Sequence, residues 1–150
     1  MPTPQKTGTI KSKVSCMIEQ SVINQPVLFL IEDEPDTAAL VTLILQEKGY
    51  QVVHAADGHD ALNKIGSMRL PSLVLLDIQL PHVDGITILE TIRATPDWHD
   101  VPVVLLTAVV DPLCIRQAVS IRVQDYVLKP FKRDTLLRCI ERALTPLARP

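Results

Sequence analysis

The chain reads VLFLIED over residues 27–33, which is five consecutive apolar residues followed by two carboxylates. Three further segments have the same form: LVLLD at 73–77, VVLLT at 103–107 and YVLK at 126–129. Such short apolar runs are typical of strands buried on both faces of a parallel sheet. The polar residues that end the four runs are Glu32, Asp33, Asp77, Thr107 and Lys129. Because ligands bind outside the carboxyl ends of parallel strands, these side chains are expected to form one site.

Helix-like segments separate the strands. The pattern predicts a second strand at residues 51–54 and helices at about 36–48, 60–67, 86–94, 112–121 and 134–144. We expect Asp36 or Thr37 to cap the first helix and Asp134 to cap the last. The buried stripe of the first helix is predicted to contain Ala39, Leu40, Leu43 and Ile44. Five strand–helix units predict an α/β fold with a doubly wound, five-stranded parallel sheet, because parallel strands need right-handed crossovers.

The rest of the chain suggests a simple organisation. Residues 1–25 are polar and basic and are predicted to be a flexible N-terminal arm, with a short helix between Val14 and Ile23. Residues 26–145 are long enough for one domain with a sizeable core. Residues 146–150 are then a C-terminal tail.

Composition excludes several classes of function. A formal net charge of -2 does not give the excess of positive charge that is typical of a nucleic-acid-binding domain. No apolar run approaches the roughly 20 residues of a membrane span, and no signal-peptide pattern precedes the first strand, so we expect a cytoplasmic protein. The three cysteines, Cys16, Cys114 and Cys139, lack metal-type spacing and are interpreted as free thiols. The four histidines are scattered, which argues against a histidine metal cluster.

The residues at the strand ends suit a cation and a phosphoryl group. Three adjacent carboxylates repel one another unless a cation neutralises them, and Mg²⁺ prefers oxygen ligands. Pro130 favours an extended backbone conformation at the preceding residue, Lys129. The ammonium group of Lys129 can reach back to Asp77 or to a phosphoryl oxygen. The Thr107 hydroxyl can donate a hydrogen bond to a phosphoryl oxygen.

Four motifs, in order and at family-like spacing, resemble the receiver domain of two-component response regulators. They are IEDEPD at 31–36, LLDIQLPHVDG at 75–85, LTA at 106–108 and DYVLKPF at 125–131. The resemblance covers roughly residues 27–144. It implies a flavodoxin-like (βα)5 fold with strand order 2-1-3-4-5.

The resemblance also implies a role for each motif residue. Asp77 would accept a phosphoryl group from a kinase phosphohistidine. Mg²⁺ would be held by Glu32, Asp33, Asp77 and the backbone carbonyl of Gln79. Phosphoryl binding and switching would involve Thr107, Ala108, Lys129 and Tyr126, with Thr107 and Tyr126 rearranging together.

The expected function is a phosphoacceptor switch that is not an enzyme beyond its own Mg²⁺-dependent phosphorylation and dephosphorylation. Its expected partners are a sensor histidine kinase or histidine phosphotransfer protein, a downstream protein target, and a second copy bound through residues 109–144 after phosphorylation. We expect a stand-alone regulator or phosphorelay intermediate without DNA-binding output. The alternative is the receiver part of a longer response regulator or hybrid kinase.

Five residues depart from the usual family pattern. Glu32 stands where aspartate is commoner, and its longer side chain should still reach the metal, directly or through water. Arg122 and Val123 replace a frequent Gly-Ala pair, and His82 replaces a frequent glycine. Cys139 stands where DNA-binding members that dimerise through the last helix often have arginine, which weakens that mode of dimerisation.

Three other functions fit less well. An aspartyl-phosphate phosphatase needs a general acid two residues after the nucleophile, and Gln79 cannot protonate a leaving group. A flavin carrier needs a phosphate-cradling loop after the first strand, where Glu32, Asp33 and Glu34 would repel phosphate. A degenerate receiver used only for docking would not be expected to keep all five polar residues.

Overall fold

The computed structural model of the chain describes residues 25–108 and 111–145. The arm predicted over residues 1–25, apart from Gln25, lies outside the described residues, as do its predicted helix and the tail over 146–150. No described helix is long and apolar enough to cross a membrane.

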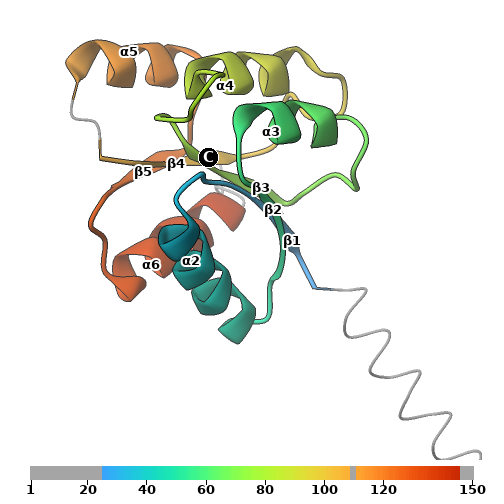
Figure 1. Ribbon diagram of the computed structural model, residues 1–150. Helices are drawn as coiled ribbons and strands as arrows, with labels where there is room; N and C mark the ends of the chain where they lie inside the picture. The colour runs from blue at the N-terminus through green and yellow to red at the C-terminus, as the bar shows by residue number, and fades with distance from the viewer. Residues whose placement is uncertain (1–24, 109–110, 146–150) are drawn as a thin grey trace, which may run out of the picture.

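The described residues form a five-stranded parallel sheet in the order β2-β1-β3-β4-β5, as the resemblance implied (Figure 1). The strands are β1 (Val27–Ile31), β2 (Gln51–Ala55), β3 (Leu73–Asp77), β4 (Val103–Thr107) and β5 (Asp125–Leu128). The three central strands β1, β3 and β4 are buried along their whole length, which explains their unbroken apolar sequences.

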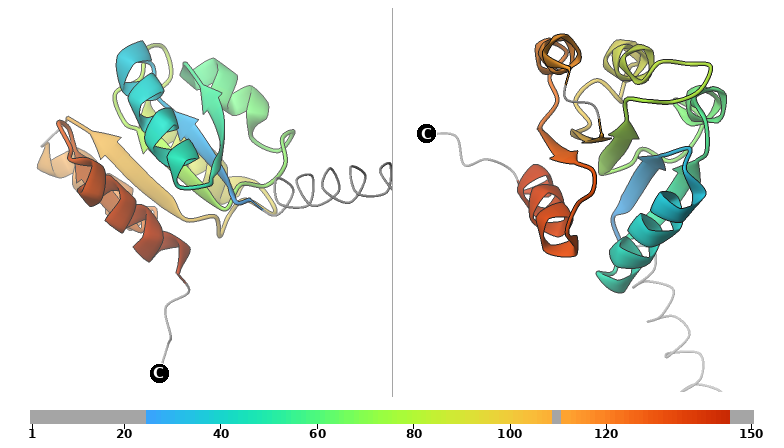
Figure 2. Two further views of the ribbon diagram at one scale, coloured as in Figure 1. Left: turned by 90° about the horizontal axis from the view of Figure 1, so that it is seen from below. Right: turned by 60° about the vertical axis from the view of Figure 1, so that its left-hand side comes forward.

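Helices cover both faces of the sheet, which makes the fold doubly wound (Figure 2). They are α2 (Pro35–Glu47), α3 (Gly58–Lys64), α4 (Gly85–Ala94), α5 (Pro112–Ser120) and α6 (Arg133–Leu144). Helices α2 and α6 pack on one face, and α3, α4 and α5 pack on the other. Strands β1, β3 and β4 therefore send alternate side chains into two separate apolar cores.

The start of α2 differs from the prediction. Glu34, rather than Asp36 or Thr37, caps the helix, and its carboxylate accepts hydrogen bonds from the amides of Asp36 and Thr37 at 3.2 and 2.6 Å. Pro35 occupies the first helical turn, where its missing N–H costs nothing.

The predicted buried stripe of α2 was also wrong, except for Ile44. The buried residues are Ala38, Val41, Ile44 and Leu45, whereas Ala39 is exposed and Leu40 and Leu43 are 51% and 55% exposed. Seven of the eight residues from 38 to 45 are apolar, so two helical faces fit the pattern almost equally well. Docking on the sheet selects one of them.

Two further expectations need correction. Helix α6 begins at Arg133 after Lys132, which makes no side-chain cap bond, and Asp134 lies in the first turn instead of capping the helix. The sequence suggested that strand β5 is covered on both faces. It is instead an edge strand in which only Val127 is buried.

Candidate functional site

Three of the described polar residues are buried, and all three lie at the carboxyl ends of central strands. They are Glu32 after β1, Asp77 at the end of β3 and Thr107 at the end of β4. Asp77 pairs in register with Leu106, and Thr107 pairs with Leu128. The sheet thus brings together residues that are distant in sequence, as the strand pattern predicted.

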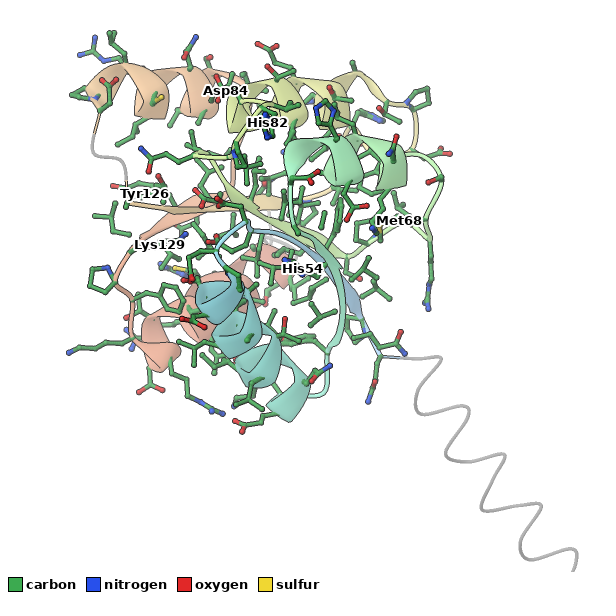
Figure 3. All side chains as sticks on the ribbon, in the orientation of Figure 1. His54, Met68, His82, Asp84, Tyr126 and Lys129 are labelled. Carbon is green, nitrogen blue, oxygen red and sulfur yellow. The ribbon has the colours of Figure 1, made fainter. Side chains whose placement is uncertain are left out.

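The ammonium group of Lys129 contacts carboxylates at the ends of two strands, β1 and β3. Its Nζ lies 2.8 Å from both carboxylate oxygens of Glu32 and 3.0 Å from Oδ2 of Asp77. Its backbone N–H donates to the carbonyl of Thr107 at 2.9 Å, and its peptide bond to Pro130 is cis. The predicted reach of Lys129 to Asp77 is therefore present. Figure 3 labels Lys129 in the segment that follows β5.

Burial and pairing change the acid–base properties of this group. Burial, together with the charge of Asp77, raises the pKa of Glu32 from its usual 4.5 to about 7, against the opposing effect of the hydrogen bond from Lys129. Burial acts to lower the pKa of Lys129, but its hydrogen bonds to Glu32 and Asp77 prevail and raise that pKa. Lys129 thus stays charged at neutral pH, while Glu32 lies near the midpoint of its titration.

Asp33 completes an acidic cluster, by which we mean Glu32, Asp33 and Asp77. One ligand atom from each of these residues lies within 4.8 Å of the others, and such a group could hold a metal ion. Asp33 is exposed, whereas the other two are buried, so the cluster is open to solvent on one side. Its donors are carboxylate oxygens, which fit Mg²⁺.

The segment after Asp77 folds back over the site. Oδ1 of Asp77 accepts a hydrogen bond from the amide of Gln79 at 2.9 Å. Gly85, at the start of α4, packs so closely that a Cβ there would lie 2.5 Å from the Cα of Ile78 and 2.8 Å from the carbonyl oxygen of Asp77. Only glycine fits this approach. The role of the Gln79 carbonyl as a metal ligand stays a prediction.

Two of the family departures fall on left-handed backbone positions. His82 has φ of 71° and Arg122 has φ of 67°, a region that favours glycine. The positive φ explains why the family often has glycine at each of these two positions. His82 also stacks on His59 of α3, with ring centroids 6.2 Å apart, so two of the scattered histidines do meet.

The remaining predicted residues lie around the site. Tyr126 is 45% exposed and so points away from the core, and Ala108 is exposed. Ala108 and Lys129 line a cavity of about 370 Å³ with Thr37, Leu40, Pro130 and Phe131. The site therefore opens beside α2.

Sequence reasoning missed two residues with clear structural roles. His54 on β2 bonds the backbone carbonyl of Glu32, and Arg93 on α4 bonds four backbone carbonyls. Both contact backbone atoms of other segments, so no sequence motif could have revealed them.

Comparison with known proteins agrees with this geometry. The family model described as the response regulator receiver domain matches residues 28–141. The DNA-binding response regulator MtrA of Mycolicibacterium smegmatis is 34% identical over 110 residues, which cover 73% of this chain and 46% of that protein. The chain therefore spans about half the length of this curated relative.

Solved structures give the same result. The signal receiver domain of a signal transduction histidine kinase from Syntrophus aciditrophicus has a TM-score of 0.73 and 30% identity, covering 83% of this chain and 94% of that one. The receiver domain of a sensor histidine kinase from Pseudomonas aeruginosa, solved with a magnesium ion coordinated in the active site cleft, has a TM-score of 0.73. It is 30% identical and covers 80% of this chain and 98% of that one. By sequence and by fold, this chain belongs to the family of response regulator receiver domains.

Proposed function

We propose that Asp77 accepts a phosphoryl group from the phosphohistidine of a sensor histidine kinase or a histidine phosphotransfer protein. A bond would form between a carboxylate oxygen of Asp77 and phosphorus, and the phosphorus–nitrogen bond to histidine would break. The observation that carries this proposal is the position of Asp77 between a bound lysine and two further carboxylates.

The acidic cluster and the carbonyl of Gln79 would hold Mg²⁺. The bound cation would neutralise the carboxylates and the oxygens of the incoming phosphoryl group. Lys129, already 3.0 Å from Asp77, would bind a phosphoryl oxygen as a point charge. Thr107, which ends the neighbouring strand β4, and the backbone of Ala108, which follows it, would bind the remaining oxygens.

Phosphorylation would act through the surface of α5 and β5, defined here by Leu113, Val119, Tyr126 and Leu128. These four side chains are between 44% and 68% exposed, so these two elements carry apolar residues that the core does not bury. In α5 only Ala118 is buried. We infer that Thr107 and Tyr126 rearrange together and change this α5–β5 surface for a protein target or a second copy.

The proposed output is protein binding, with no direct contact to nucleic acid. The alternative is a receiver that forms part of a longer regulator, because the chain covers 46% of a relative named as DNA-binding. In either case residues 26–145 are proposed to be the complete phosphoacceptor domain.

A phosphotransfer assay tests this proposal. A panel of purified histidine kinases, autophosphorylated with labelled ATP, is incubated with the full chain and Mg²⁺. We expect at least one kinase to transfer label to the chain, and chelation of Mg²⁺ to prevent the transfer. Transfer that persists after chelation would contradict the proposed chemistry.

A further inference from the structure

His54 makes a direct hydrogen bond to the backbone of the acidic cluster. Its Nε2 lies 2.8 Å from the carbonyl oxygen of Glu32, although His54 is on β2 and Glu32 follows β1. A carbonyl oxygen can only accept, so the ring nitrogen must be the donor. The bond thus requires the tautomer, or the protonated ring, that carries hydrogen on Nε2.

This contact holds the peptide unit that joins Glu32 to Asp33. The peptide unit is planar, so fixing its carbonyl also fixes the direction in which the Asp33 backbone begins. The preceding peptide unit is held as well, because the amide of Glu32 donates to the carbonyl of Ala55 at 3.1 Å. Strand β2 therefore restrains both sides of Glu32, just where the chain leaves the sheet.

Asp33 depends on this restraint more than the other two carboxylates do. Glu32 and Asp77 are buried and bound by Lys129, whereas Asp33 is exposed on a loop after β1. The direction of its side chain is consequently set in large part by the backbone. A small rotation of the Glu32–Asp33 peptide would move the Asp33 carboxylate away from the other two.

We propose that His54 is a positioning residue for the magnesium site, acting on Asp33 through the Glu32 carbonyl. This inference rests on the proposed function, since it assumes that the acidic cluster binds Mg²⁺. The ring of His54 is exposed, so its removal deletes little buried apolar surface. A purely structural role would therefore lower stability slightly and leave metal affinity unchanged.

The test is a calorimetric Mg²⁺ titration of the full chain without any phosphodonor. The variants are His54→Ala, His54→Gln and the control His59→Ala, with Asp33→Ala as the reference for a lost ligand. Glutamine places its Nε2 the same number of bonds from the backbone as the histidine Nε2 and can donate the same hydrogen bond. Urea unfolding of each variant without metal measures stability separately.

We expect His54→Ala to weaken Mg²⁺ binding about tenfold, the lower end of the range for residues that orient metal ligands. His54→Gln should recover most of that affinity, and His59→Ala should bind as the wild type does. In phosphorylation by a small donor, His54→Ala should need more Mg²⁺ for half-maximal rate but reach the wild-type rate at saturation.

Three results would overturn the inference. If wild type and Asp33→Ala bind Mg²⁺ and differ as expected, but His54→Ala matches wild type, His54 has no positioning role and the metal site stands. If His54→Gln binds as weakly as His54→Ala, the hydrogen bond is not the cause. If the wild type itself binds no Mg²⁺, the proposed function fails and this inference fails with it.

Discussion

The ammonium group of Lys129 lies 2.8 Å from each carboxylate oxygen of Glu32, so the lysine binds both oxygens of the glutamate at once. The side chain of Glu32 is fully buried and that of Lys129 is 19% exposed, which leaves little water to screen the pair. Glu32, at a position where aspartate is commoner in the family, therefore contacts the lysine through both carboxylate oxygens. Lys129 is therefore a partner of Glu32 in addition to any bound cation.

Stability should depend on pH through Glu32. Its pKa is about 7 in the folded chain and about 4.5 when unfolded, so the folded state holds a proton between these values that the unfolded state has lost. The free energy of unfolding of the wild type should then fall as pH rises from 5 to 8, by on the order of 2 kcal/mol. Glu32→Gln removes this titration.

Urea unfolding in metal-free buffer at pH 5, 6, 7 and 8 measures the effect. The quantity to compare is the difference between the free energies of unfolding of Glu32→Gln and wild type. We expect that difference to favour the variant increasingly at higher pH. A difference that does not change with pH would show that Glu32 titrates at its ordinary pKa.

Metal affinity should depend on Asp33 more than on Glu32. The Asp33 carboxylate is exposed at the open side of the cluster, whereas both oxygens of Glu32 already accept from Lys129. Asp33→Ala should lower Mg²⁺ affinity by about tenfold or more, and Glu32→Gln should have a smaller effect. Mg²⁺ titration at pH 8 decides the order, and a larger loss in Glu32→Gln would reverse this assignment.

The meeting of Glu32, Asp77 and Thr107 could be predicted because each of them ends an apolar run, whereas their roles stay predictions. The ends of β1, β3 and β4 could be located to the residue, and parallel topology alone places Glu32, Asp77 and Thr107 at one edge. The face of α2 could not be predicted, because Leu40 and Leu43 are as apolar as the residues that are buried. Which of two apolar faces docks depends on the angle and rotation of the helix against the sheet.

Hydrogen bonds from side chains to backbone atoms could not be predicted from the sequence either. The guanidinium of Arg93 bonds the carbonyls of His99 and Val101 at 3.0 and 2.7 Å, and those of Ile121 and Arg122 at 3.2 and 2.5 Å. A backbone carbonyl is offered by every residue, so sequence gives no sign of which ones an arginine will meet. This group ties the end of α5 to the segment before β4, at the edge of the sheet opposite the site.

Arg93→Ala should therefore destabilise the chain without touching the site. Losing hydrogen bonds from a charged donor to four carbonyls, two of them in partly buried contacts, is expected to cost about 2–4 kcal/mol. The matched control is Arg116→Ala, an exposed arginine on α5, which should change the free energy of unfolding by less than about 0.5 kcal/mol. Urea unfolding of both variants makes the comparison, and equal stability would show that the Arg93 contacts contribute nothing net.

The switch should be visible by hydrogen exchange. Phosphorylation adds about two negative charges and three acceptor oxygens next to Thr107 and Lys129, which flank the α5–β5 surface. A movement of Thr107 towards the phosphoryl group should let the exposed Tyr126 turn inward. With Mg²⁺ and beryllofluoride, protection should change chiefly in residues 107–131. A change confined to residues 77–85 would place the output elsewhere.

The central claim is that Asp77 alone accepts the phosphoryl group. The full chain is incubated with a small acyl phosphate and Mg²⁺, and its intact mass is measured beside that of Asp77→Asn, which keeps the size of the side chain but removes its charge. The wild type should gain one phosphoryl group and Asp77→Asn none. Equal phosphorylation of Asp77→Asn would contradict the account.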